Sequence, residues 1–185
     1  MRRFVALVAS VASLALPSLA CADPPRCDPR RNALVADLGL HLVAVGFDRS
    51  LGCDVSLQAS AGLYVPWDVN RDLFGLGGGL QRDVGGAVLR VRPFFHPEGE
   101  GRVGFWVSPF VQAGVVLAPR GDEQLTGLAV SLGMSAGYTW SLGERWLLSL
   151  GGGAQVQAAL FAGNTAPPGF VGVGPHVDIN VDYLL

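Results

Sequence analysis

The sequence predicts an all-β protein, folded as a single small antiparallel transmembrane β-barrel of eight strands. Segment after segment alternates large apolar residues with small or polar ones, and strand side chains point alternately to opposite faces of a sheet. Half of the residues are apolar and only 15% are charged. Beyond the N-terminus, however, no apolar run reaches the roughly 20 residues that a spanning helix needs. A barrel with an apolar outer face accounts for both observations.

Residues 170–185 show the alternation most clearly. One parity is apolar throughout: Val171, Val173, Pro175, Val177, Ile179, Val181, Tyr183 and Leu185. The other parity is small or polar: Gly172, Gly174, His176, Asp178, Asn180 and Asp182. Small residues suit the crowded interior of a narrow barrel, so we expect the apolar parity to face outward, into lipid.

Seven segments have strand character: 34–47, 54–65, 86–96, 103–118, 127–140, 146–161 and 170–185. Single-chain bacterial barrels have an even number of strands, so an eighth is needed. It comes either from 72–80 or from a split of 34–47. Two half-strands of about seven residues fall short of the roughly 9–11 that a tilted spanning strand requires, which favours 72–80. Pro93, Pro109 and Pro175 lie inside these segments and predict bulges or strand ends, because each removes a ladder hydrogen bond.

Residues 1–22 have the pattern of a cleaved secretory signal peptide. Arg2 and Arg3 precede an apolar stretch, and small residues lead to a cleavage site after Ala22. An uncleaved anchor and lipidation of Cys21 are the alternatives, although Ser18 stands where a lipidation signal has Leu. Residues 23–32 then form a proline-rich periplasmic lead-in, and 33–185 form the barrel.

The cysteines bear on the choice of the eighth strand. After cleavage, Cys27 and Cys53 would lie in an oxidising compartment, where a disulfide forms readily. Two free thiols are the alternative. A single strand over 34–47 would place these cysteines near opposite membrane faces, so a disulfide between them would favour the split.

The inward parity carries several charged residues, and we predict that they form a lumenal polar network. Buried charges in a narrow barrel must be paired and hydrogen-bonded, which makes a structural role more plausible than a proton path or a hydrolytic centre. The predicted members are Asp37, His41, Asp54, Arg90, Arg92, His176, Asp178 and Asp182.

Recognised catalytic and ligand-binding motifs are missing from the sequence. It has no Gly-x-Ser-x-Gly nucleophile motif, no phosphate-binding loop and no zinc-ligand spacing. The net charge of −2, without a clustered basic face, gives no reason to expect nucleic acid as a partner. We therefore predict no enzyme activity, no metal and no other cofactor.

Two segments resemble the small outer-membrane barrels of Gram-negative bacteria, of the OmpX, OmpW and OmpA-barrel type. They are the last eight residues, 178–185, and the unit Gly137-Tyr-Thr-Trp-Ser-Leu-Gly-Glu-Arg-Trp146, which looks like a strand, a tight periplasmic turn and a strand. The resemblance covers about residues 33–185. It implies that the outer-membrane assembly machinery recognises the C-terminal strand, although Leu185 replaces the usual terminal aromatic. Aromatic residues at strand ends predict an interfacial girdle: Trp67, Trp140, Trp146 and Tyr183.

The function expected from this fold is that of a monomeric integral outer-membrane protein, in contact with outer-membrane lipid, with a structural or surface-interaction role. The longest loops available for such contacts are 66–85 and 119–126. One alternative, suggested by the OmpW-like resemblance, is the binding and lateral transport of a small hydrophobic ligand. Another is a secreted lipocalin-like carrier, which would need an apolar cavity and a polar outer face.

Overall fold

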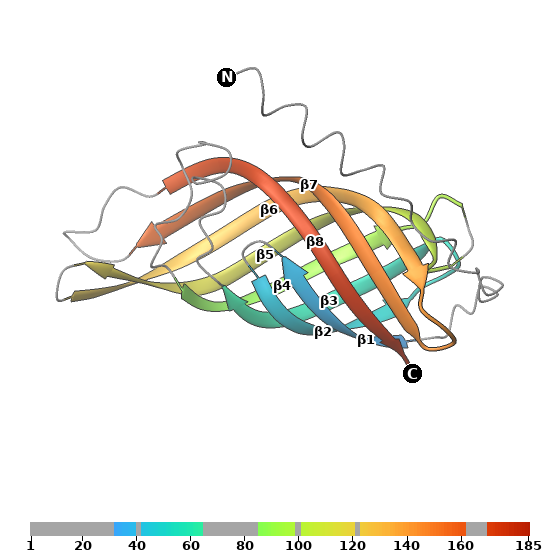
Figure 1. The fold of residues 1–185 in the computed structure, drawn as a ribbon. Coiled ribbons are helices and arrows are strands. Elements are labelled where there is room, and N and C mark those ends of the chain that lie inside the picture. Colours follow the sequence, from blue (N-terminus) through green and yellow to red (C-terminus); the bar gives the residue numbers. More distant parts are fainter. Residues whose placement is uncertain (1–31, 40–41, 65–84, 99–100, 121–122, 162–169) are drawn as a thin grey trace, which may run out of the picture.

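The structure, a computed structural model, describes residues 32–39, 42–64, 85–98, 101–120, 123–161 and 170–185. Eight strands form a closed antiparallel barrel in which every strand pairs with its neighbours in the sequence (Figure 1). They are β1 (Asn32–Gly39), β2 (Leu42–Ser50), β3 (Val55–Tyr64), β4 (Gly85–Phe95), β5 (Gly104–Arg120), β6 (Glu123–Ser141), β7 (Trp146–Phe161) and β8 (Phe170–Leu184). The predicted all-β class and the eight strands are confirmed.

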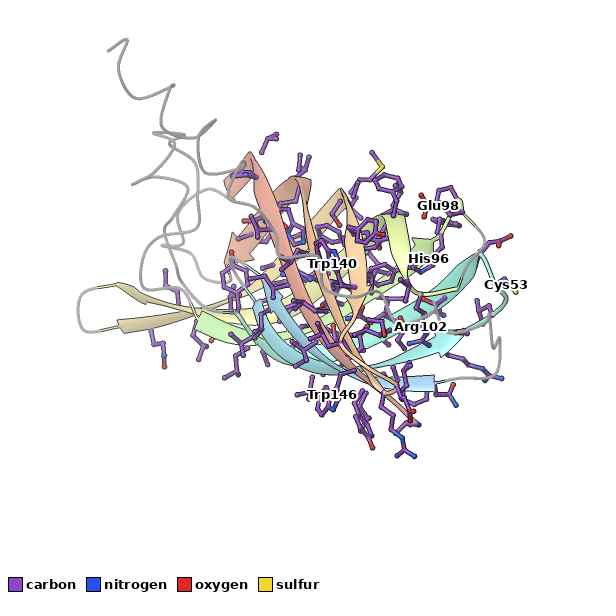
Figure 2. The ribbon with its side chains drawn as sticks, turned by 45° about the vertical axis from the view of Figure 1, so that its right-hand side comes forward. Cys53, His96, Glu98, Arg102, Trp140 and Trp146 are labelled. Carbon is purple, nitrogen blue, oxygen red and sulfur yellow. The ribbon has the colours of Figure 1, made fainter. Side chains whose placement is uncertain are left out.

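The first and last strands close the barrel, and this pairing defines one of its ends. Ala33 near the start of β1 pairs with Leu184 at the end of β8, and the C-terminus lies beside the start of β1 (Figure 1). We call this the terminal end; the β2–β3, β4–β5 and β6–β7 connections lie here. Figure 2 shows Cys53, His96 and Arg102 together at this end. Within the described residues, no helix is long and apolar enough to cross a membrane.

The eighth strand arises from the split of 34–47, so the choice of 72–80 is wrong. Residues 34–39 belong to β1 and residues 42–47 to β2, and the two strands pair from Asn32↔Arg49 to Leu38↔Val43. β3 pairs directly with β4, through Tyr64↔Gly86, and segment 72–80 lies outside the described residues. The two strands have 8 and 9 residues, because Asn32, Ala33 and residues 48–50 also join the ladder.

The split also reverses which residues of β2 face outward. Leu42 and Ala44 lie on the parity expected outside, yet both are buried, whereas Val43 and Val45 are exposed. The chain reverses between Gly39 and Leu42 while the apolar alternation of the sequence continues without a break. The alternation therefore looks like one strand although it belongs to two.

The long β5–β6 hairpin corrects a second expectation. Residues 119–126 were expected as a loop, but the β5–β6 ladder continues through Leu117↔Thr126 and Pro119↔Gln124 to Arg120↔Glu123. In the ladder the backbone N–H and C=O groups of this segment bond to the neighbouring strand, whereas in a loop they would bond to water. The polar composition of the segment gave no sign of this pairing.

Two of the three strand prolines face each other at a gap in the β4–β5 ladder. Pairing stops at Val91↔Val111 and resumes at Phe95↔Val107, and Pro93 and Pro109 lie between these pairs. The Ser108 hydroxyl donates to the Pro93 carbonyl at 2.7 Å, replacing a hydrogen bond that the prolines cannot make. Pro175, in contrast, remains within the β7–β8 ladder opposite Ala154.

The outer face of the barrel is apolar on all eight strands. Each strand carries at least one large apolar side chain that is more than half exposed: Leu34, Val45, Leu63, Leu89, Val115, Leu132, Leu160 and Val173, from β1 to β8 in order. The apolar parity of the sequence is therefore the outer one.

Large aromatic rings fill part of the interior, and glycines make room for them. Trp106 is fully buried and meets Phe94 edge to face, with 5.1 Å between ring centroids. Gly137 and Gly151 lie in succession across the strands from Trp106, and a Cβ at either position would collide with its indole. These glycines are thus required by packing rather than by backbone conformation.

We predict that Gly151→Ala destabilises the barrel by about 1–3 kcal/mol, the usual cost of overpacking a filled interior. The matched control is Gly152→Ala, whose Cβ would meet only the His176 carbonyl oxygen at 3.6 Å, an ordinary contact. Urea unfolding in detergent micelles, followed by tryptophan fluorescence, measures both variants. Equal stabilities would contradict the packing role of Gly151.

Candidate functional site

The centre of the interior holds two arginines and two aspartates. Arg92 on β4 forms a bidentate ion pair with Asp178 on β8, in which Nη1 lies 2.8 Å from Oδ1 and Nη2 lies 3.0 Å from Oδ2. Arg90 on β4 contacts Asp37 on β1 at 3.1 Å and Asp178 at 3.4 Å. All four side chains are almost completely buried, and their formal charges cancel. Paired guanidinium–carboxylate contacts of this kind are strong and orientationally specific.

Neutral polar groups take up the remaining hydrogen-bonding capacity of this central cluster. Arg92 donates to the hydroxyls of Ser108 and Ser135, both at 2.9 Å. Arg90 donates to Gln112 Oε1 at 3.1 Å from Nη2, and Asp37 accepts from Ser60 at 3.0 Å. The network thus joins β1, β3, β4, β5, β6 and β8 across the interior.

Aromatic rings enclose the arginines. The Arg92 guanidinium lies 4.4 Å from the centroid of Phe94, and that of Arg90 lies 5.0 Å from Phe110. His176 Nε2 lies 2.8 Å from Asp178 Oδ1, and the ring of His176 packs against Phe110 at 4.4 Å. The faces of aromatic rings attract cations, so these rings stabilise the buried arginines as well as filling space.

A second polar cluster closes the interior near the terminal end. Asp48 on β2 forms an ion pair with Arg102 at 3.0 Å and accepts a hydrogen bond from Ser56 at 3.1 Å. Close by, the hydroxyls of Thr139 and Ser149 are 2.7 Å apart. With His96 and Asp182, these side chains line a cavity of about 10 Å³, roughly the space that one water needs.

The predicted lumenal residues fall into four groups. Asp37, Arg90, Arg92, His176 and Asp178 lie together in the central cluster, and Asp182 lies with the terminal-end cluster. Asp54 is wrongly predicted: it is exposed in the β2–β3 turn, because β2 ends at Ser50 and β3 begins only at Val55. His41 lies outside the described residues.

Sequence reasoning missed several members of both clusters. Asp48 lies one residue beyond the predicted segment 34–47, and Arg102 belongs to the β4–β5 connection, whose residues have no strand parity. His96 ends segment 86–96 on the parity of Arg92 but is not among the predicted network residues. Other members do carry a usable signal, since they share the inward parity of the predicted charges: Gln58, Ser60, Ser108, Gln112 and Ser135.

Of the predicted interfacial aromatics, three lie at the terminal end, on the outward parity of their strands. Trp146 is half exposed and points away from the barrel (Figure 2), with its ring 5.0 Å from that of Tyr183. Trp140, near the end of β6, packs against Tyr138, with 5.0 Å between the rings. Trp67 lies outside the described residues.

Cys53 is disulfide-bonded, and it is exposed in the β2–β3 turn. The other two cysteines of the chain, Cys21 and Cys27, lie outside the described residues. The pairing of Cys53 with Cys27 therefore stays a prediction.

The side chains of the two clusters connect strands across the interior of the barrel. In the central cluster each carboxylate is bound by an arginine, and in the part of the chain that the structure describes no group of three or more His, Cys, Asp or Glu residues could hold a metal ion. A neutral, hydrogen-bonded network rigidifies the structure that contains it.

We predict that Asp178→Ala costs about 3–5 kcal/mol, because it leaves Arg92 without its carboxylate partner inside the barrel. The control is Asp54→Ala, which removes the same side chain from an exposed turn and should change stability little. Urea unfolding of both variants in micelles measures the difference. A loss for Asp178→Ala no larger than that for Asp54→Ala would contradict the role of the central cluster.

His96 lies just beyond β4 and gives a prediction for pH. Burial, reinforced by the nearby positive charge of Arg102, lowers the pKa of His96 to about 4, and Asp54 opposes the shift only partly. Unfolded histidine has a pKa of about 6.5, so the unfolded state binds more protons between these values. The contribution of neutral His96 to stability is thus complete above pH 6.5 and decreases as the pH falls toward 4.

We therefore expect His96→Gln to lose less unfolding free energy than the wild type when the pH falls from about 7.5 to about 4.5. Other titrating groups affect both proteins alike, so the difference between them isolates His96. Equal losses for the two proteins would contradict a buried, neutral His96.

The fold and the two clusters define a closed eight-stranded β-barrel with a charged interior and an apolar exterior. Residues 29–156 match the family described as "Protein of unknown function (DUF3575)", and the chain belongs to that family. No curated protein matches it.

Among solved structures, the chain is similar to the N-terminal β-barrel domain of Pseudomonas aeruginosa OprF, known from a crystal structure. The two are 17% identical, the alignment covers 81% of this chain and 95% of that one, and the TM-score is 0.45. The finer assignment to the OmpX or OmpW type stays a prediction.

Proposed function

We propose that this protein is an integral outer-membrane β-barrel with a structural or surface-contact role and no catalytic step. The observation that supports it best is the apolar outer face, with large side chains more than half exposed on all eight strands. In water so extensive an apolar surface is a liability, since soluble monomers rarely expose patches beyond a few hundred Å². In lipid it is favourable, and a closed barrel satisfies the backbone groups that lipid cannot.

The two ends of the barrel suggest its orientation. Both described termini lie at the terminal end, which in an even-stranded outer-membrane barrel is the periplasmic one. Trp140, Trp146 and Tyr183 would then form the periplasmic part of the aromatic girdle. The disulfide of Cys53 suits this oxidising compartment, which the chain would reach by its signal peptide.

The charged interior supports a structural role over the two alternatives. A lipocalin-like carrier needs an apolar cavity and a polar exterior, the reverse of what the barrel has. Transport of a hydrophobic ligand through the barrel needs an apolar path, and the contacts among Arg92, Asp178 and Ser135 cross the interior between three strands. Neither alternative is favoured.

Gel mobility of the protein from isolated outer membranes, in SDS with and without boiling, tests this proposal. We expect a folded form that resists SDS and shifts on heating, and that is found in the outer-membrane fraction. A soluble periplasmic protein with no heat-dependent shift would overturn the proposal.

A charge placed on the outer face adds a sharper test. Leu132→Arg puts an arginine on the exposed face of β6, which should cost about 2–4 kcal/mol if it lies near the middle of the bilayer. Leu142→Arg makes the same change at an exposed position of the β6–β7 turn, outside the bilayer in this orientation. We expect only Leu132→Arg to reduce the heat-modifiable fraction, and equal fractions would contradict a lipid-facing β6.

A further inference from the structure

The outer face of the barrel is hollowed where β1 to β4 meet β8 and the start of β7. The hollow has a volume of about 960 Å³, and its lining is almost entirely apolar. Small residues form its floor: Ala36, Gly46, Ala59 and Ala61. Larger side chains form its walls: Leu34, Val45, Phe47, Leu89, Val91, Trp146, Val181 and Tyr183. Ala36, Ala59 and Ala61 occupy outward positions of β1 and β3 where large side chains would fill the hollow.

Strand register shows that the hollow runs obliquely. Successive cross-strand pairs join Trp146, Tyr183, Leu34, Phe47, Ala59 and Val91 into one row. Trp146 is the first residue of β7, at the terminal end, whereas Ala59 and Val91 lie well inside β3 and β4. Because barrel strands are tilted, such a row climbs from the rim toward the middle of the barrel wall.

The rim end of the hollow is polar and holds two arginines, with the exposed Glu144 beside one of them, Arg145. Arg145, in the β6–β7 turn, donates to the Tyr183 hydroxyl at 3.0 Å, and the Tyr183 ring packs against Trp146. Arg49 is exposed and follows Phe47 by two residues, so it lies on the same outward face, closer to the terminal end. An apolar trough therefore leads to a rim with two aromatic rings and two arginines.

We propose that this trough binds one anionic phospholipid, with an acyl chain in the hollow and its phosphate at the rim beside Arg145, Tyr183 and Arg49. The inference rests on the proposed membrane location. The long apolar hollow matches an acyl chain, and arginine binds phosphate through paired N–H groups. Tyrosine and tryptophan favour the boundary between the apolar and polar parts of a lipid. The basic rim selects a negatively charged headgroup over a zwitterionic one.

Native mass spectrometry of the detergent-solubilised, heat-modifiable protein tests this. The probes are phosphatidylglycerol and phosphatidylethanolamine with identical acyl chains. We expect one phosphatidylglycerol to be retained per barrel, in preference to phosphatidylethanolamine. Arg145→Gln combined with Arg49→Gln should weaken phosphatidylglycerol binding by about tenfold or more, the factor expected for a lost charge-assisted hydrogen bond, and should abolish the preference.

A matched pair of alanines tests the hollow itself. Ala61→Phe fills the floor of the trough, whereas Ala113→Phe adds the same ring at an exposed outer position of β5, outside the hollow. Only Ala61→Phe should lose the bound lipid. Equal retention by the two variants, equal retention of the two lipids by the wild type, or a lipid-free dimer that Ala61→Phe disrupts would overturn the proposal.

These outcomes are separable from failure of the proposed function. The measurement uses only protein that resists SDS until it is heated, so it begins from a folded barrel. A protein without that property refutes the membrane location, whereas a folded barrel without lipid selectivity refutes only the phospholipid site.

Discussion

The buried charges of the narrow interior constrain the rest of the structure. Arg92 on β4 and Asp178 on β8 come from different sides of the barrel. They form a bidentate ion pair, and both side chains are fully buried. A buried charge without its partner is very costly, so both strands must keep the register that brings these groups together. Ser108, Ser135, Gln112 and Ser60 complete the cluster, and Gly137 and Gly151 allow Trp106 to pack beside it.

With these four charged side chains paired inside, the apolar parity faces outward, and this determines the character of the exterior. Most outward positions carry large side chains, but Ala36, Ala59 and Ala61 leave the oblique hollow that ends at Trp146, Tyr183 and Arg145. The interior thus accounts for stability, whereas the exterior is the face that meets other molecules. In the proposed membrane setting those molecules are lipids, and the rim of the hollow provides the chemistry to distinguish among them.

Period-2 alternation predicted most of the fold from sequence. It gave the barrel class, six strands close to their observed bounds, and the inward side of Arg90, Arg92 and Asp178. It failed where β2 follows β1 without a break in the alternation, which hid the β1–β2 hairpin and placed Leu42 on the wrong face. Parity does not locate strand ends, so Asp54 was misplaced, and it says nothing about turns, so Arg102 was missed. The hollow depends on cross-strand register among six strands, which no local pattern reveals.

Spin labels on single cysteines, in protein reconstituted into liposomes, test most directly whether the apolar parity faces outward, into lipid. Labels at Leu63, Leu132 and Val156 replace exposed apolar side chains, and labels at Ser60, Ser131 and Gln155 replace buried polar ones on the same strands, β3, β6 and β7. We expect the first set to collide readily with oxygen dissolved in lipid and only weakly with a water-soluble nickel complex. Strong collision of that set with the nickel complex would contradict a lipid-facing exterior.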